Sequence, residues 1–162
     1  MTATPATAPE LFTLRPIAFV RGGRAEPTDD DWDAVAATIM LLPAFGAEAL
    51  AGLDGFSHVE VVFLFHRVAE TAVVVGARHP RGRADWPKVG IFAQRGKDRP
   101  NRLGVSVCRL VAVEGTTLRV AGLDAIDGTP VLDLKPAMRG FLPRGDLREP
   151  AWAGELMRGY WD

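Results

Sequence analysis

Turn signals punctuate this chain at short intervals, and this spacing constrains the fold more than any other feature of the sequence. Between its 12 prolines and 17 glycines lie short apolar runs, many of them rich in β-branched and aromatic residues. No helical pattern of about ten to fifteen residues separates these runs, as crossovers between parallel strands would require. We therefore expect a mainly β protein with an antiparallel sheet system or barrel. The expected strands cover residues 15–21, 57–66, 71–77, 88–94, 103–113, 117–123 and 131–135.

The segment 57–66 gives the strongest strand signal. Its centre is apolar with little alternation, which favours burial on both faces or a place inside a sheet. A link of three residues, Glu114-Gly115-Thr116, joins 103–113 to 117–123 and is short enough for a hairpin. These two strands should therefore pair antiparallel.

Two segments carry helical spacing. Residues 32–40 place apolar side chains at helical intervals, but 38–42 is equally compatible with a strand. Near the C-terminus, Trp152, Leu156 and Tyr160 share helical spacing, which predicts a short helix that docks on the rest of the protein.

The length of 162 residues is typical of one domain, and 48% hydrophobic residues are enough for a core. We expect a disordered tail over 1–12, a barrel over 13–145 and a helix within 146–162 packed on the barrel. No apolar run approaches the roughly 18 to 20 residues of a membrane helix, and the N-terminus lacks a cationic start. We therefore expect a cytoplasmic protein without membrane contact. Since Cys108 is the only cysteine and the three histidines lack metal-type spacing, we expect neither a disulfide nor a metal site.

A cationic loop lies between two apolar runs in the middle of the chain. Arg95, Lys97, Arg99 and Arg102 fall within eight positions, where a plain turn would need only Gly, Pro and Asn. A guanidinium group pairs with carboxylate or phosphate through two parallel hydrogen bonds. This excess of cations predicts an anionic partner.

The charge of the whole chain is unevenly distributed around this loop. Residues 78–110 hold nine Lys and Arg against two Asp and Glu, whereas residues 1–77 hold four against ten. Such a basic stripe can attract a nucleic-acid backbone. The alternative is a solvated face whose arginines pair with the acidic flanks, and the charges alone do not separate the two.

Familiar catalytic motifs are absent. No two glycines stand two positions apart, so the dinucleotide fingerprint G-x-G-x-x-G is missing, and there is no Walker A sequence. Ser106 lies within a strand instead of at a sharp turn, which favours a core hydroxyl over a nucleophile. Cys108 is expected to be a small buried side chain.

Two polar positions at strand ends are candidate site residues. His66 ends the strongest strand, where a side chain can reach a site, and a structural role is about equally compatible with its position. Asp124 closes a strand before a turn and can face whatever Arg95 faces, which would suit a zwitterionic ligand. For Asp127 we expect only a turn cap made through its own backbone.

Six segments of the chain match one known pattern in the same order. They are Pro16-Ile17 with Val20-Arg21, then 52–58 (GLDGFSH), 63–66 (FLFH), 89–95 (VGIFAQR), 99–104 (RPNRLG) and 123–136 (LDAIDGTPVLDLKP). Together they resemble the TsaA-like family over roughly residues 15–136. The resemblance implies a compact antiparallel β-barrel that binds S-adenosyl-L-methionine, usually as a homodimer. It also implies methyl transfer to N6 of threonylcarbamoyladenosine-37 in tRNA, and it favours a strand at 38–42.

The resemblance also implies roles for individual residues. Arg99 and Asn101 match the family's Arg-Pro-Asn element and would link cofactor and RNA. No residue is an obvious base for the methyl transfer, and His66 is a candidate with solvent as the alternative. The implied cofactor contacts are His66, Arg67, Arg95, Leu103, Gly104, Val105, Gly122, Leu123 and Asp124.

The chain departs from the family pattern on the RNA side. Residues 94–97 are Gln-Arg-Gly-Lys where family members often have Thr-Arg-Ser-Pro, and an acidic run at 28–32 replaces a Pro-Arg-Gln arm. Two alternatives therefore stay open. One is a methyltransferase that acts on another RNA or on a small molecule, and the other is a non-catalytic module that binds cofactor or RNA.

Overall fold

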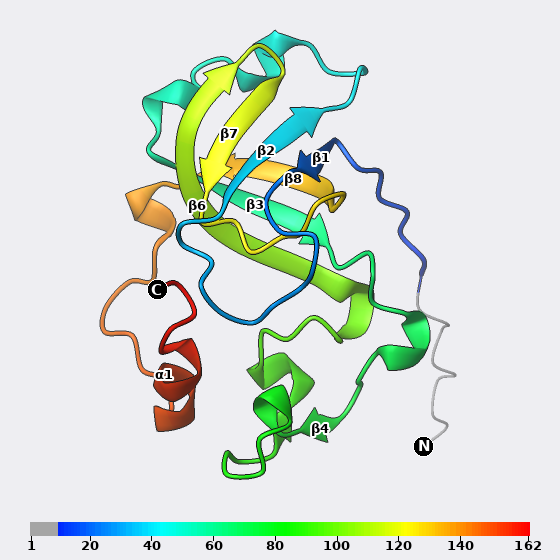
Figure 1. Cartoon of the computed structure of the whole chain (residues 1–162), viewed down its shortest axis with the longest axis vertical. Helices are drawn as coiled ribbons and strands as arrows, with labels where there is room; N and C mark the ends of the chain where they lie inside the picture. The colour runs from blue at the N-terminus through cyan, green and yellow to red at the C-terminus, as the bar shows by residue number, and fades with distance from the viewer. Residues whose placement is uncertain (1–9) are drawn as a thin grey trace, which may run out of the picture.

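The computed structural model describes residues 10–162 and contains a closed six-stranded barrel (Figure 1). Around the barrel the order is β1-β2-β7-β6-β3-β8, and β8 returns to pair with β1. All six pairings are antiparallel, which confirms the predicted mainly β barrel. The strands are β1 (Ala18–Arg21), β2 (Ala36–Leu41), β3 (His58–Leu64), β6 (Leu103–Glu114), β7 (Thr117–Ala121) and β8 (Pro130–Pro136).

The strand β3 alternates strictly between buried and half-buried residues. Val59, Val61 and Phe63 point into the core, while the residues between them are partly exposed. Of the two alternatives expected for this strand, burial on both faces was wrong, because a closed barrel buries only the inner face of each strand. A place inside a sheet is confirmed, since β3 pairs with β6 on one side and β8 on the other. The core is filled by mostly aliphatic side chains from the strands, together with Phe63 of β3 and Cys108 of β6.

Two other expectations for strands were correct. The hairpin of β6 and β7 is confirmed, with Glu114 opposite Thr117 across a turn in which Gly115 has a φ of 61°. The ambiguous segment at 32–42 contains β2, which pairs with β1 on one side and β7 on the other. This double pairing explains why the strand prevails over the helical spacing.

Two predicted strands are mostly absent. Residues 71–77 and 88–94 contribute only β4 (Ala77–Arg78) and β5 (Val89–Gly90), which form a separate two-stranded sheet. They lie outside the barrel and lack its neighbouring strands, so most of these residues adopt short helical turns or irregular structure. The 3-10 turns of the described chain are η1 (Ala47–Leu50), η2 (Leu53–Gly55), η3 (Glu70–Ala72), η4 (Pro80–Gly82), η5 (Ile91–Ala93), η6 (Pro100–Arg102) and η7 (Arg139–Phe141).

The C-terminal helix is present but shorter than the spacing predicted. It is α1 (Ala151–Met157), and Gly159 then takes a left-handed conformation with a φ of 84°. Since this conformation cannot continue a helix, the chain turns there and Tyr160 leaves the helical path. Trp86 fixes the helix by donating from Nε1 to Glu155 Oε2 at 2.7 Å.

The predicted domain boundaries stay predictions. The disordered tail expected at 1–12 falls mostly on residues 1–9, which lie outside the described part of the chain. Within residues 10–162, no helix is long and apolar enough to cross a membrane. The same residues contain no group of three His, Cys, Asp or Glu side chains arranged to hold a metal ion.

Candidate functional site

The loop between β1 and β2, residues 22–35 and hereafter the first loop, meets the turn before β8 at one end of the barrel. Asp127 N donates to Arg24 O at 2.8 Å, and Gly22 N donates to Asp127 Oδ1 at 2.9 Å. The expectation that Asp127 only caps its own turn was therefore wrong. Its carboxylate fastens two loops that are distant in sequence.

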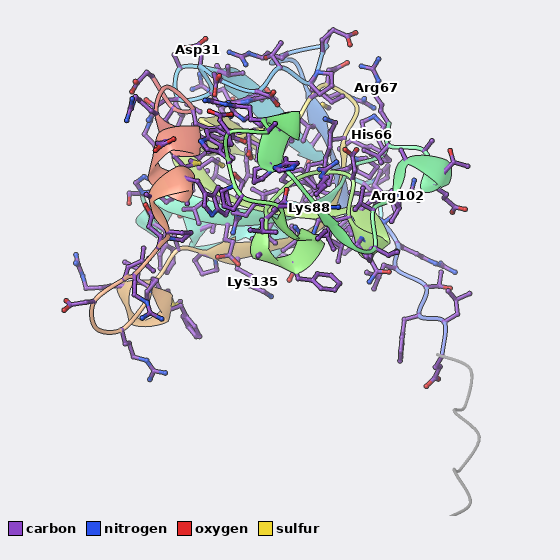
Figure 2. The ribbon with its side chains drawn as sticks, turned by 90° about the horizontal axis from the view of Figure 1, so that it is seen from below. Asp31, His66, Arg67, Lys88, Arg102 and Lys135 are labelled. Carbon is purple, nitrogen blue, oxygen red and sulfur yellow. The ribbon has the colours of Figure 1, made fainter. Side chains whose placement is uncertain are left out.

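The pair His66-Arg67 follows β3 and borders the same loops (Figure 2). Arg67 Nη1 donates to Ala25 O in the first loop at 2.7 Å. His66 lies beside Gly128, since a Cβ added there would be 3.9 Å from His66 Nε2. Burial, and then the charge of Arg67, lower the pKa of His66 below its ordinary value. At neutral pH the imidazole is therefore uncharged and able to accept a proton.

Asp124 lies just beyond β7 and is half-buried. Its Oδ1 accepts from Ser106 Oγ at 2.5 Å and its Oδ2 accepts from Tyr160 OH at 2.5 Å. Ser106 is thus buried as predicted, but its hydroxyl donates a hydrogen bond to the Asp124 carboxylate. No Lys, Arg or His nitrogen of residues 10–162 lies within 4.0 Å of the Asp124 carboxylate.

Arg95 contacts β6 at Val105, the residue before Ser106. Its Nη2 donates to Val105 O at 2.6 Å, and the side chain is largely exposed. The positive charges of Arg81 and Arg95 both lower the pKa of Tyr160, against a larger rise caused by burial and by Asp124. Arg95, Tyr160 and Asp124 therefore lie within electrostatic range of one another.

The implied cofactor contacts at the start of β6 and after β7 are backbone positions under steric constraint. A Cβ at Gly104 would lie 2.4 Å from the Phe63 ring, so only glycine allows this close approach. Gly122 has a φ of 78°, and its N–H donates to Val35 O in the first loop at 3.0 Å. Leu123 is fully buried, while Leu103 is half-buried and Val105 is exposed.

The Arg-Pro-Asn element shapes the cationic loop. Arg99 Nη1 donates to Gln94 O at 2.7 Å, and Arg102 Nη1 donates to Val68 O at 2.6 Å. Asn101 lies between them, exposed and in a left-handed conformation with a φ of 62°. Arg99 is thus held inside the loop, whereas the Asn101 side chain faces solvent.

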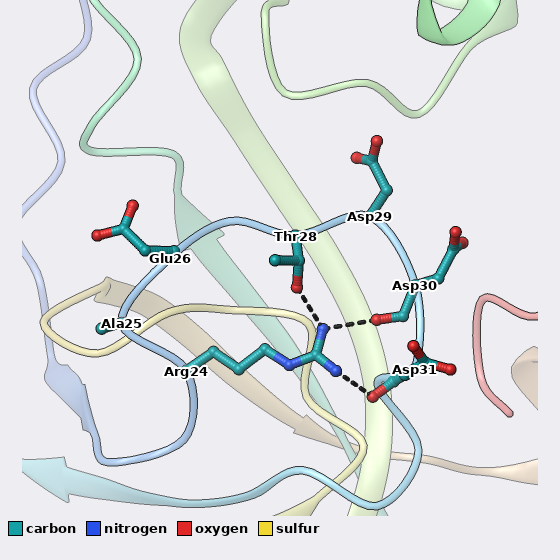
Figure 3. A pocket seen from close by; sticks show the side chains of 7 residues that line it. All are labelled: Arg24, Ala25, Glu26, Thr28, Asp29, Asp30 and Asp31. Carbon is teal, nitrogen blue, oxygen red and sulfur yellow. Dashed lines mark hydrogen bonds between the residues drawn. The ribbon is translucent and has the colours of Figure 1, made fainter.

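The first loop borders an open hollow of about 660 Å³ that is lined by residues 24–26 and 28–31 (Figure 3). Arg24 fills its floor: the guanidinium donates to Thr28 Oγ1 and to the carbonyl oxygens of Asp30 and Asp31, and stacks 4.4 Å from the Trp32 ring. The Asp carboxylates point away from Arg24, so the rim is acidic. Neither Arg95 nor Asp124 lines this hollow, and the acidic run was its only indication in the sequence.

The basic stripe divides into paired and unpaired cations. Its ion pairs are Arg78–Asp98, Arg81–Asp30, Arg83–Asp85, Arg102–Glu70 and Arg109–Asp33. Within residues 10–162, Lys88, Arg95, Lys97 and Arg99 have no carboxylate oxygen within 4.0 Å. Phe92 lies among these four in sequence and is 76% exposed. These four cations without a carboxylate partner among the described residues are called the basic cluster below.

Comparisons with known proteins agree on one family. The family model described as tRNA-methyltransferase O N-terminal domain matches residues 25–141. A protein of Pyrococcus abyssi named as a probable S-adenosyl-L-methionine-binding protein is 36% identical over 91% of this chain and 78% of its own length. The tRNA (adenine(37)-N6)-methyltransferase of Escherichia coli is 38% identical over 60% of this chain and 43% of its own length.

Solved structures lead to the same family. The crystal structure of TrmO from Pseudomonas aeruginosa aligns with a TM-score of 0.69 and 34% identity, over 86% of this chain and 62% of that one. The chain therefore spans less than two thirds of that structure and under half of the Escherichia coli enzyme.

Proposed function

Since this chain belongs to the family of the tRNA-methyltransferase O N-terminal domain, we propose that it is an S-adenosyl-L-methionine-dependent methyltransferase that modifies N6 of threonylcarbamoyladenosine-37 in tRNA. The names of the relatives support both the cofactor and the tRNA substrate. The observation that carries the proposal is that the side chains of Arg95 and Asp124 hydrogen-bond to consecutive residues of β6, at Val105 and Ser106.

The polar groups at this end of the barrel fit the cofactor chemically. S-adenosyl-L-methionine has a carboxylate, an ammonium group, a ribose diol and an adenine. Arg95 is a cation without a carboxylate partner among the described residues, and Asp124 is a carboxylate without a cationic one. We propose that Arg95 binds the cofactor's carboxylate and that Asp124 accepts from its ammonium or a hydroxyl.

The remaining contacts would come from the segments around these two side chains. His66 and Arg67 would meet the purine or the ribose. The backbone positions Leu103, Gly104 and Val105, together with Gly122 and Leu123, would line the cofactor.

The bound cofactor supplies an electrophilic methyl group, and the protein's task is to hold the acceptor nitrogen in line with it. Such positioning can lower a barrier by several kcal/mol. The acceptor nitrogen also loses a proton. His66 is uncharged at neutral pH because burial lowers its pKa, so it is our candidate for the base, with solvent as the alternative.

The basic cluster is the part of the surface best suited to RNA. Arg95 is assigned to the cofactor, and Lys88, Lys97 and Arg99 lack carboxylate partners among the described residues, so the charges of these three are available for phosphates. Phe92 adds an exposed aromatic ring on which an unstacked base can rest. We propose that Arg99 and Asn101 lie between the cofactor and the RNA.

The family premise also leads us to propose a cytoplasmic homodimer. The outer face of β6 carries exposed valines, Val105, Val107 and Val111, which a partner subunit would cover. Sedimentation of the purified protein would test this, and a monomer at micromolar concentration would contradict it.

The acidic rim of the first loop favours a second candidate. Glu26, Asp29 and Asp31 would repel the backbone of a tRNA that approached from that side. A methyltransferase that acts on a small molecule entering beside the first loop would be compatible with this charge, as would one acting on another RNA that approaches from a different side.

Three measurements test these proposals: cofactor calorimetry, mass spectrometry of nucleosides and the salt dependence of RNA binding. Calorimetry should give about one S-adenosyl-L-methionine site per chain. The absence of heat at high cofactor concentration would contradict the proposal that this protein is a methyltransferase dependent on that cofactor. Mass spectrometry of anticodon-loop nucleosides, after incubation with threonylcarbamoylated tRNA, should show one added methyl group. Cofactor binding without this product would favour the second candidate. Salt-sensitive RNA binding without methyl incorporation would indicate a non-catalytic module.

A further inference from the structure

The last residues of the chain are attached to the first loop. Three consecutive N–H groups, those of Asp31, Trp32 and Asp33, donate to the carbonyl oxygens of Gly159, Tyr160 and Trp161, at 3.1, 3.0 and 3.2 Å. Segments from opposite ends of the chain thus form one bonded unit beside the predicted cofactor residues. The family model ends at residue 141, so it covers none of the C-terminal segment.

Tyr160 is the residue of this segment that reaches the site. Its hydroxyl donates to Asp124 Oδ2, and its ring lies 5.9 Å from the Arg81 guanidinium. Arg81 in turn pairs with Asp30 of the first loop at 2.9 Å. The phenol is held from two sides. Burial and the negative charge of Asp124 raise its pKa above the ordinary value, so it remains a proton donor at any physiological pH.

The helix before Tyr160 fixes where this donor stands. Trp86 donates to Glu155 and packs against Trp152 with ring centroids 6.5 Å apart. The left-handed Gly159 then directs the chain toward the barrel. The contacts of Trp86 hold α1 in place, and α1 in turn fixes the position of the Tyr160 hydroxyl. The hydroxyl therefore has little freedom to move away from Asp124.

Among the described residues, only hydroxyl groups donate side-chain hydrogen bonds to the Asp124 carboxylate. It is half-buried, and two neutral hydroxyls hydrogen-bond to it, but no cationic side chain of residues 10–162 pairs with it. A carboxylate removed from water is most stable with a cation beside it. The two hydroxyls set its orientation and leave its charge available.

We propose that Tyr160, together with Ser106, is a positioning residue that orients the Asp124 carboxylate toward the ammonium or hydroxyl group of the cofactor. The C-terminal segment then completes the binding site instead of only packing on the barrel. This inference rests on the proposed function, because it assigns Asp124 to the cofactor.

The test is a double-mutant cycle on cofactor affinity. Calorimetry with S-adenosyl-L-methionine is run on the wild type, Tyr160→Phe, Asp124→Asn and the double variant, with melting temperatures measured for all four. Tyr160→Phe should weaken binding about tenfold, as the loss of a hydrogen bond to a charged group would. In the Asp124→Asn background the same change should have almost no effect, because Tyr160 acts through that carboxylate. Met157→Ala, at an exposed position of α1, is the control and should bind like the wild type.

Each outcome has a separate meaning. If the wild type binds no cofactor, the proposed function fails. If the wild type binds and Tyr160→Phe binds equally well, the positioning role is wrong. Equal losses from Tyr160→Phe with and without Asp124→Asn would also overturn it, because they would show a general structural effect.

Discussion

Arg95 and Asp124 hydrogen-bond to consecutive residues of β6, Arg95 to the Val105 carbonyl at 2.6 Å and Asp124 to the Ser106 hydroxyl at 2.5 Å. The two side chains approach one short stretch of strand without forming an ion pair with each other. Each keeps its charge available, and a ligand with both an anionic and a cationic group can satisfy the two together.

Arg95→Ala should weaken S-adenosyl-L-methionine binding by about ten- to a hundredfold, since it removes a charge-assisted contact. Calorimetry measures this directly. Arg144→Ala is the matched control, because Arg144 is exposed in the segment before α1 and should not affect binding. If Arg95→Ala retains the wild-type affinity, the cofactor's carboxylate binds elsewhere.

Arg99→Ala should reduce methylation of threonylcarbamoylated tRNA more than it reduces cofactor binding. The variant loses a cation of the basic cluster, and the loop loses the bond from Arg99 to Gln94 O. Methyl incorporation from labelled cofactor and calorimetry on the same preparation give the two values. Equal losses would mean that Arg99 belongs to the cofactor site and not to the RNA side.

Phe92→Ala should weaken binding of an anticodon stem-loop by roughly 1–3 kcal/mol, the usual contribution of one base stacked on an aromatic ring. Phe92→Tyr should retain most of the affinity, since it keeps the ring. Phe141→Ala removes another phenylalanine, which is 88% exposed, and serves as the control. Fluorescence anisotropy at fixed salt measures all three, and identical affinities would exclude Phe92 from the RNA contact.

The rate of methyl transfer should depend on the protonation of His66. Burial and Arg67 lower the pKa of this imidazole below 6.5, so the uncharged base is already present at neutral pH. As the pH falls through that lowered pKa, the ring gains a proton and the rate should fall. In His66→Gln the rate should be lower and this pH dependence lost. An unchanged profile would assign the proton to solvent.

Gly104→Ala should destabilise the barrel by about 1–3 kcal/mol, because the new methyl group would overlap the Phe63 ring. Thermal denaturation monitored by circular dichroism measures the loss. Gly140→Ala is the control, as a Cβ there meets no atom within 4 Å. An equal melting temperature for both variants would mean that the Phe63 ring can move aside.

The strands of the barrel were predictable where local pattern and long-range pairing agree. The β6–β7 hairpin has a short link between two apolar runs, so its local sequence is sufficient to predict that the two strands pair. Residues 71–77 and 88–94 have equally good strand composition, but neither has a barrel strand to pair with. Local propensity therefore predicted too many strands, because it contains no information about partners.

The positions of the candidate site residues were predictable in part, for a related reason, while their roles stay predictions. Arg95 and Asp124 stand out because charged residues at strand ends are conspicuous beside apolar runs. Tyr160 was expected to be one apolar position of a helix, and its spacing gave no hint of a bond to Asp124. The cue was Gly159, whose left-handed conformation ends the helical path and redirects the next residue.

Closure of the barrel joins segments far apart in the sequence, since Ala18 of β1 stands opposite Val131 of β8. On a ribosome, the first strand is therefore made long before its second neighbour, and its edge stays unpaired until residue 131 has left the exit tunnel. Contacts of this length slow folding, so the ring should form late, in one step that also brings the first loop beside the turn before β8. A nascent chain arrested before β8 should expose that edge and depend on chaperones.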